Sequence, residues 1–272
     1  MAMNPDDTKK KQNSIISVHD VWKSYDKLEV LKGLNLDVFE EETVVIMGRS
    51  GVGKSVLLRQ ILGIERPDKG YVEIRGQRIS DMSQYNRFKV VKSMGMLFQG
   101  SALFDSMTVG ENTAFYIRQH EPQMAEKEIK KRVDDALAMV GMEGTQSKMP
   151  SDLSGGMRKR AALARLIVYR PHILLYDEPT TGLDPITAMQ INELINKTKK
   201  ELKATSIVVT HDVRSAIEVG DRLAFHYDGV IKQIAPKDEF LKIQDPLLQA
   251  FFKNAILTKD NLDNHQEHRP NG

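Results

Sequence analysis

Two features are missing from this sequence: cysteine and any long apolar run. The absence of cysteine excludes disulfides, thiolate catalysis and cysteine-based metal sites, and it suits a reducing compartment. No window of about 18 apolar residues occurs, so no segment is expected to span a bilayer. Residues 1–13 also lack the apolar core of a signal peptide. If the protein serves a membrane, we expect it to do so from the cytoplasmic face of that membrane, through a partner.

The sequence also lacks a dominant charge. It has 39 basic and 37 acidic residues, a net charge of +2. Hydrophobic residues make up 40% and charged residues 28%, a balance typical of a globular protein with a core. Because no strong overall field favours nucleic acid, we expect none among the partners.

The apolar periodicity predicts an α/β core with a helical insertion. Strand patterns occur at 15–18, 34–38, 43–47, 71–74, 173–176, 206–210, 223–226 and 230–234. By contrast, apolar residues repeat at helical spacing within 124–140, so a mostly helical lobe is predicted over about 101–165.

Both ends of the chain are expected to lie outside the domain at 15–250. Residues 1–14 read as a disordered tail, and 251–272 read as the end of an amphipathic helix followed by disordered polar residues. A stripe of apolar residues near this point would share one helical face: Leu247, Leu248, Phe251 and Phe252. The stripe either extends a dimer, binds an accessory subunit, or docks on its own domain.

A glycine-rich loop follows the apolar run 43–47 and precedes a helical pattern from Lys54 to Leu62. It matches a phosphate-binding P-loop at every fixed position: Gly48, Arg49, Ser50, Gly51, Val52, Gly53, Lys54 and Ser55. Its glycines let backbone N–H groups approach the β-phosphate, Lys54 brings charge to the β- and γ-oxygens, and the Ser55 hydroxyl ligates Mg²⁺. The helix that begins here, which includes Val56, directs its positive end at the anion.

Two further motifs carry polar groups suited to the same chemistry. The predicted strand 173–176 ends in Asp177, placed to help hold Mg²⁺, and Glu178, placed to polarise an attacking water. The Ser154-Gly155-Gly156 run precedes a helix predicted at 158–170 and forms a second anion cradle. Two phosphate cradles in one chain are unusual for a single-site kinase or GTPase.

The order of motifs resembles that of the ABC ATPase family over about residues 15–245. It runs through the P-loop, Gln99, Leu-Ser-Gly-Gly at 153–156, strand-Asp-Glu, Gly182-Leu183-Asp184 and His211. The resemblance implies a P-loop NTPase (RecA-like) core with an antiparallel β subdomain and an inserted helical subdomain. It also implies a homodimer that closes on two ATP molecules with Mg²⁺.

The resemblance further implies residue roles. Tyr25 would stack on adenine, although a half-buried surface tyrosine is the alternative. Gln99 would contact Mg²⁺ and link the site to a membrane partner, Glu178 would be the catalytic base, and His211 would touch the γ-phosphate.

The remaining roles implied by the family concern the second copy. Ser154, Gly155 and Gly156 would bind the γ-phosphate held by that copy, and Asp184 would lie at the dimer seam. A non-transport ABC protein is disfavoured, because the chain has neither a long coiled coil nor a second cassette.

Within the family, the chain is similar to the Mla/Mce-type ATPases, which energise phospholipid transport between the inner and outer membranes of diderm bacteria. The stretches that carry this similarity are Gly48–Ser55, Gln99–Ser106 and Ser154–Arg160. It implies permease subunits, an Mce-type lipid-binding subunit, a small accessory subunit and a place at the inner membrane. An importer of a small polar solute, such as an amino acid, is the alternative. The apolar residues within 103–107 either receive a helix of a membrane subunit or belong to the core of the lobe.

Overall fold

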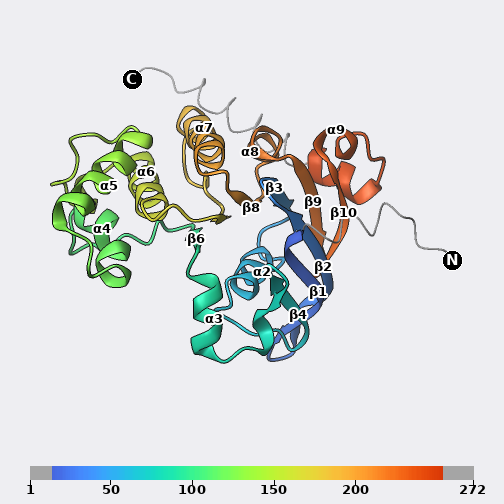
Figure 1. Cartoon of the computed structure of the whole chain (residues 1–272). Coiled ribbons are helices and arrows are strands. Elements are labelled where there is room, and N and C mark those ends of the chain that lie inside the picture. The colour runs from blue at the N-terminus through green and yellow to red at the C-terminus, as the bar shows by residue number, and fades with distance from the viewer. Residues whose placement is uncertain (1–13, 254–272) are drawn as a thin grey trace, which may run out of the picture.

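The structure, a computed structural model that describes residues 14–253, contains two β-sheets with helices around them (Figure 1). The first sheet is antiparallel and has the strand order β2-β1-β4-β5. Its strands are β1 (Ser14–Tyr25), β2 (Leu28–Phe39), β4 (Lys69–Ile74) and β5 (Gln77–Arg78).

The second sheet is mostly parallel and has the order β10-β9-β3-β8-β7-β6. Only its edge strand β10 runs antiparallel to its neighbour. Its strands are β3 (Thr43–Met47), β6 (Met94–Leu97), β7 (Ile173–Asp177), β8 (Thr205–Thr210), β9 (Arg222–Tyr227) and β10 (Val230–Pro236).

Three helices form a lobe beside the sheets, at the left of Figure 1: α4 (Val109–His120), α5 (Glu126–Met139) and α6 (Gly155–Ile167). The other helices are α2 (Lys54–Ile61), α3 (Gln84–Val91), α7 (Pro185–Leu202), α8 (Val213–Val219) and α9 (Lys237–Phe240), with single 3-10 turns at Ile79–Asp81 and Pro150–Asp152. Across 14–253, no helix is long and apolar enough to cross a bilayer. The predicted α/β core with an antiparallel subdomain and an inserted helical subdomain is confirmed.

The central strand β3 is buried at every residue because it is covered on both faces. Val45 and Met47 belong to the core cluster shared with the helical lobe and with α7 and α8. Val44 and Ile46 belong to the cluster shared with the first sheet and α2. Alternate side chains therefore join the two halves of the molecule through one strand.

Helix boundaries differ from prediction where capping residues decide them. Helix α6 was expected over 158–170 but begins at Gly155, because the Ser154 side chain accepts a hydrogen bond from Met157 N at 3.3 Å. It ends early, before Arg170, which has a left-handed φ of 54°. Helix α7 was not predicted, although Asp184 caps it and Pro185 stands at its first position, a recognised start signal.

Residues 246–253 are helical and pack on the domain itself. The Phe251 ring lies 5.3 Å from Phe225, and Leu248 is fully buried. Of the three alternatives for this stripe, the structure shows docking on its own domain. The expectation that Leu247 shares the apolar face is wrong, since this side chain is 43% exposed. The polar residues predicted to be disordered at 1–13 and 254–272 lie outside the described residues.

The turn between α8 and β9 provides a test of core packing. A methyl group on Gly220 would lie 2.6 Å from Leu223 Cδ2 and 2.8 Å from Ala216 O. We expect Gly220→Ala to lower the free energy of unfolding by about 1–3 kcal/mol, the usual effect of overpacking. Urea denaturation of Gly100→Ala is the control, because no atom lies within 4 Å of the added methyl there. An unchanged midpoint for Gly220→Ala would contradict this account.

Candidate active site

Four loops meet at the carboxyl ends of the parallel strands. The P-loop follows β3, Gln99 follows β6, Glu178 follows β7 and His211 follows β8. Together with the end of β1 and the first part of β2 they enclose a pocket of about 360 Å³. Its lining consists of Tyr25, Val30, Ser50, Gly51, Gly53, Lys54, Ser55, Val56, Gln99, Glu178, Thr181 and His211. Most of the residues singled out in the sequence therefore lie in one place.

The start of α2 presents backbone donors to this pocket. Gly53 caps the helix with a φ of 100°, a conformation that residues with a side chain avoid. A Cβ atom there would also lie 2.6 Å from Val30 Cγ1. No side chain caps the helix, so the first N–H groups of α2 are left for a ligand.

Lys54 holds a buried positive charge in the pocket and is only 5% exposed. Its ammonium donates to Gly48 O at 2.8 Å and to Arg49 O at 3.0 Å, and it lies 3.4 Å from Glu178 Oε1. Burial lowers the pKa of Lys54, and the Glu178 carboxylate opposes this. Arg49 and Gly48 thus contribute carbonyl oxygens rather than side chains, and Val52 does not line the pocket.

Ser55 and Asp177 form a pair of oxygen groups beside the lysine. The Ser55 hydroxyl donates to Asp177 Oδ1 at 2.9 Å. Burial raises the pKa of Asp177, partly offset by this hydrogen bond, so its ionised form gains from a nearby cation. A hydroxyl and a carboxylate are ligands that suit Mg²⁺.

Glu178 is the centre of a polar cluster. It has a left-handed φ of 48°, and its Oε2 accepts from Thr181 Oγ1 at 3.1 Å and lies 2.9 Å from His211 Nδ1. Burial acts to raise the pKa of Glu178, but the His211 hydrogen bond and the Lys54 charge hold it below its ordinary value. The same hydrogen bond raises the pKa of His211.

The Tyr25 ring stands at the edge of the pocket with its hydroxyl held. The hydroxyl donates to Glu65, and Glu65 also accepts from Arg59 Nε at 2.7 Å. The side chain is 39% exposed. A ring that is fixed at its far end and lines the pocket suits the stacking role expected from the sequence.

The second predicted cradle lies outside the pocket. Ser154 and Gly155 are exposed, as is Asp184. The N-terminus of α6 packs closely on the start of α7, since a Cβ on Gly156 would lie 2.6 Å from Thr187 Cγ2. The cradle and Asp184 are therefore neighbours on one surface of the molecule, and neither lines the pocket.

Sequence reasoning missed three residues at the site. Val30 and Thr181 line the pocket, and Glu65 fixes Tyr25. Thr181 could have been found from the sequence, because its hydroxyl lies only three residues after the predicted base Glu178. Val30 and Glu65 had none, because they reach the site only through the pairing of β1 with β2 and the turn after α2.

Two residues of the apolar segment 103–107 differ in whether they belong to the core of the lobe or to its surface. Leu103 packs against the main core cluster. Phe104 is 37% exposed, and its ring contacts Phe115 and the guanidinium of Arg165. Phe115 and Arg165 also line a second hollow of about 240 Å³ between the lobe and the sheet, so Phe104 lies beside the lining of that hollow.

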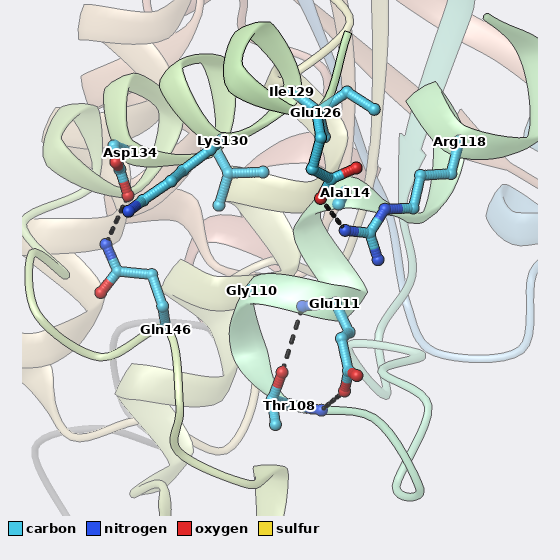
Figure 2. A pocket seen from close by; sticks show the side chains of 11 residues that line it. Thr108, Gly110, Glu111, Ala114, Arg118, Glu126, Ile129, Lys130, Asp134 and Gln146 are labelled. Atoms are coloured by element: carbon cyan, nitrogen blue, oxygen red, sulfur yellow. Dashed lines mark hydrogen bonds and ion pairs between the residues drawn. The ribbon is translucent and has the colours of Figure 1, made fainter. Parts of the chain in front are cut away.

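Another hollow, of about 650 Å³, lies on the lobe between α4 and α5 (Figure 2). Its floor is apolar, and its rim carries the Arg118–Glu126 ion pair and a hydrogen bond from Gln146 to Asp134 at 2.7 Å. None of the residues singled out in the sequence lines it.

The His211–Glu178 contact predicts a pH effect. We expect Glu178→Gln to lower the pKa of His211 toward about 6.5, its ordinary value, as measured by NMR titration of the ring protons. Because the folded-state pKa of His211 is raised, its stabilising contribution is complete below about 6.5 and is lost as pH rises through the folded value. The lowered pKa of Glu178 acts oppositely, so its contribution is lost as pH falls below about 4.5.

His211→Gln identifies the His211 resonance in these spectra. An unchanged His211 pKa in Glu178→Gln would show that the carboxylate does not act on the imidazole.

Comparison with known proteins identifies the family of this chain. The family described as "ABC transporter" matches residues 31–181. Among solved structures, the ATP-binding cassette MJ0796, in a dimeric post-hydrolysis state bound to ADP and Pi, has a TM-score of 0.76 at 32% identity, covering 82% of this chain and 98% of that one. CbiO1 of Clostridium perfringens has a TM-score of 0.77 at 31% identity, covering 92% of this chain and 95% of that one.

The relatives of this chain are named for different transported compounds. The chain is 38% identical to the intermembrane phospholipid transport ATP-binding protein MlaF of Haemophilus influenzae, over 89% of this chain and 91% of that protein. It is 37% identical to TRIGALACTOSYLDIACYLGLYCEROL 3 of Arabidopsis thaliana (89% and 74%) and 35% identical to the methionine import ATP-binding protein MetN of Clostridium tetani (92% and 78%). The matched P-loop, the shared fold and the full-length relatives establish that this chain is an ATP-hydrolysing member of the ABC transporter family.

Proposed function

We propose that this chain is the ATPase subunit of a complex that transports phospholipid between the inner and outer membranes. The observation that carries the proposal is the extent of the match to MlaF, which spans 91% of that protein at 38% identity. The match to MetN is less complete, at 78% of that protein and 35% identity. A second relative is named for trigalactosyldiacylglycerol, which is also a lipid.

The pocket is suited to ATP. Tyr25 would stack on the adenine, and the P-loop and the N-terminus of α2 would surround the phosphates. Mg²⁺ would be held by Ser55, Asp177 and Gln99, since a hydroxyl, a carboxylate and an amide oxygen are hard donors. The bound ion would neutralise charge on the phosphates.

Lys54 links nucleotide binding to catalysis. Its three N–H groups are directed to Gly48 O, Arg49 O and Glu178, so a phosphate oxygen must replace one of these partners. When a phosphate takes the place of Glu178, the carboxylate is released from Lys54 and can accept a proton from the attacking water. His211 and Thr181 then keep Glu178 oriented.

We propose that two copies complete two sites. The exposed cradle Ser154, Gly155 and Gly156 would contact the γ-phosphate in the pocket of the other copy, and Asp184 would lie at the seam. The similarity to a dimeric cassette supports this arrangement.

Permease subunits would dock at the hollow between the lobe and the sheet. Two exposed aromatic side chains are found here: Phe98 lines the hollow, and Phe104 contacts Phe115 and Arg165 of its lining. Apolar side chains gathered in this way suit a short helix of a membrane subunit. The complex would hold this chain at the cytoplasmic face of the inner membrane and include an Mce-type lipid-binding subunit and a small accessory subunit.

The catalytic proposal predicts the behaviour of Glu178→Gln. The variant should bind ATP but release phosphate at least about a hundredfold more slowly, because general-base catalysis has that magnitude. With ATP and Mg²⁺ it should accumulate as a dimer in light scattering. Near-normal turnover would rule out Glu178 as the base.

A second substitution in this background tests the shared site. Ser154→Arg should abolish the ATP-dependent dimer, because Ser154 caps α6 at the proposed contact. Ser83→Arg is the matched control, since Ser83 caps α3 with the same kind of hydrogen bond, to Asn86 N, away from the cradle. A dimer that persists in Ser154→Arg would refute the proposal that two copies complete each site.

The cargo is tested by purifying the chain from its native membrane in mild detergent and identifying proteins and lipids by mass spectrometry. We expect a permease, an Mce-type subunit and copurifying phospholipid. A periplasmic solute-binding protein without lipid would instead favour the alternative, an importer of a small polar solute such as an amino acid, to which the MetN similarity corresponds.

A further inference from the structure

The loop that carries Gln99 holds an unfavourable conformation. Residues 98–108 connect β6 to α4, between the sheet and the lobe (Figure 1). Ser101 and Ala102 are consecutive in this loop and have φ angles of 65° and 50°. A side chain at Cβ disfavours this left-handed region, so two such residues in a row require surrounding contacts that hold them.

Helix α6 supplies two of these contacts. The Lys159 ammonium donates to Gln99 O, and the Arg165 guanidinium donates to Ala102 O at 2.5 Å. Both are charged donors, which form stronger hydrogen bonds than neutral ones. The loop backbone is thus fixed to α6 at both ends of the strained pair.

Helix α4 fixes the other end of the loop. The Asn112 side chain is fully buried; its Oδ1 accepts from Phe104 N at 2.8 Å and its Nδ2 donates to Phe104 O at 3.0 Å. The loop therefore cannot shift as a whole unless the lobe shifts with it.

Lys159, which holds the start of the loop, is unusual because it is a buried lysine. It is only 5% exposed, and its ammonium donates a hydrogen bond to Gln99 O. Burial lowers the pKa of Lys159, while Asp177 and Glu178 oppose the change from nearby. A buried lysine disfavours its own charge unless a fixed acceptor satisfies it, and here that acceptor is the backbone of the residue proposed to contact Mg²⁺.

We infer that Lys159 is a positioning residue that sets the place of Gln99 from helix α6. The same helix begins at the Ser154 cradle. One rigid element therefore joins the cradle, which would contact the nucleotide of the second copy, to Gln99, which would contact Mg²⁺ in the pocket of its own copy. Movement of the cradle is passed to Gln99 through Lys159. This inference rests on the proposed contact of Gln99 with Mg²⁺.

The test compares variants of the full chain in the Mg²⁺ concentration needed for half-maximal ATP hydrolysis and, without turnover, for half-maximal binding of a non-hydrolysable ATP analogue. Lys159→Met keeps the side-chain length and removes the donor. We expect it to need about fivefold more Mg²⁺, which corresponds to a hydrogen bond of about 1 kcal/mol. Lys159→Arg, which keeps donor and charge, should restore the value to within about twofold.

The sign of the change separates positioning from electrostatics. If Lys159 acted only as a charge near Asp177 and Glu178, its removal would favour a second cation and lower the Mg²⁺ requirement. A lower or unchanged requirement in Lys159→Met would overturn the inference.

Two further variants distinguish the remaining explanations. Arg160→Met removes an α6 cation that donates to Val140 O at 3.0 Å on the other side of the helix, so it should lower the melting temperature without changing the Mg²⁺ requirement. Gln99→Ala should raise the requirement at least as much as Lys159→Met. If Gln99→Ala has no effect, the proposed metal contact of Gln99 fails and the inference fails with it. If Gln99→Ala raises the requirement and Lys159→Met does not, only the inference fails.

Discussion

One buried ion pair, between Lys54 and Glu178, governs the chemistry of this chain. Lys54 is tolerated in the interior because two loop carbonyls and this carboxylate surround its ammonium group. Removing one partner from such a pair leaves an uncompensated charge, which is strongly destabilising. A phosphate is an anion that can replace the carboxylate without leaving Lys54 alone. In the proposed mechanism, nucleotide binding would therefore be an exchange of anions at Lys54, and the displaced carboxylate of Glu178 would be the group placed to act on water.

The parallel sheet makes this exchange possible by aligning strand ends. Met47 is paired with Thr210, and Asp177 is paired with Val209, so the loops that follow β3, β7 and β8 start at the same edge. Each of these strands is buried on both faces, which fixes their relative height. Side chains from residues more than a hundred positions apart thus meet, as Ser55 and Asp177 do.

The sequence predicts those parts of the site that depend on local pattern. The P-loop, the Asp177-Glu178 pair and His211 each follow an apolar run of strand length, so their strands and loops were expected. Glu65 was not foreseeable, because it meets Tyr25 across 40 positions of sequence and belongs to no pattern. The error at Leu247 has a local cause: Asp245 accepts from the N–H groups of both Leu247 and Leu248, so the helix starts there and only the second leucine faces the core.

The chain contains two proposed anion sites, the pocket at the P-loop and the Ser154 cradle at the start of α6. The exposed start of α6 offers the N–H groups of its first turn, with Ser154 as their cap. The pocket holds Lys54 together with Ser55 and Glu178 in its lining. In the proposed dimer, each of these would supply groups to a phosphate that the other does not. Because α6 also holds the loop of Gln99, completing one proposed site from outside would change the geometry inside the other, and this would be the physical basis on which two copies act together.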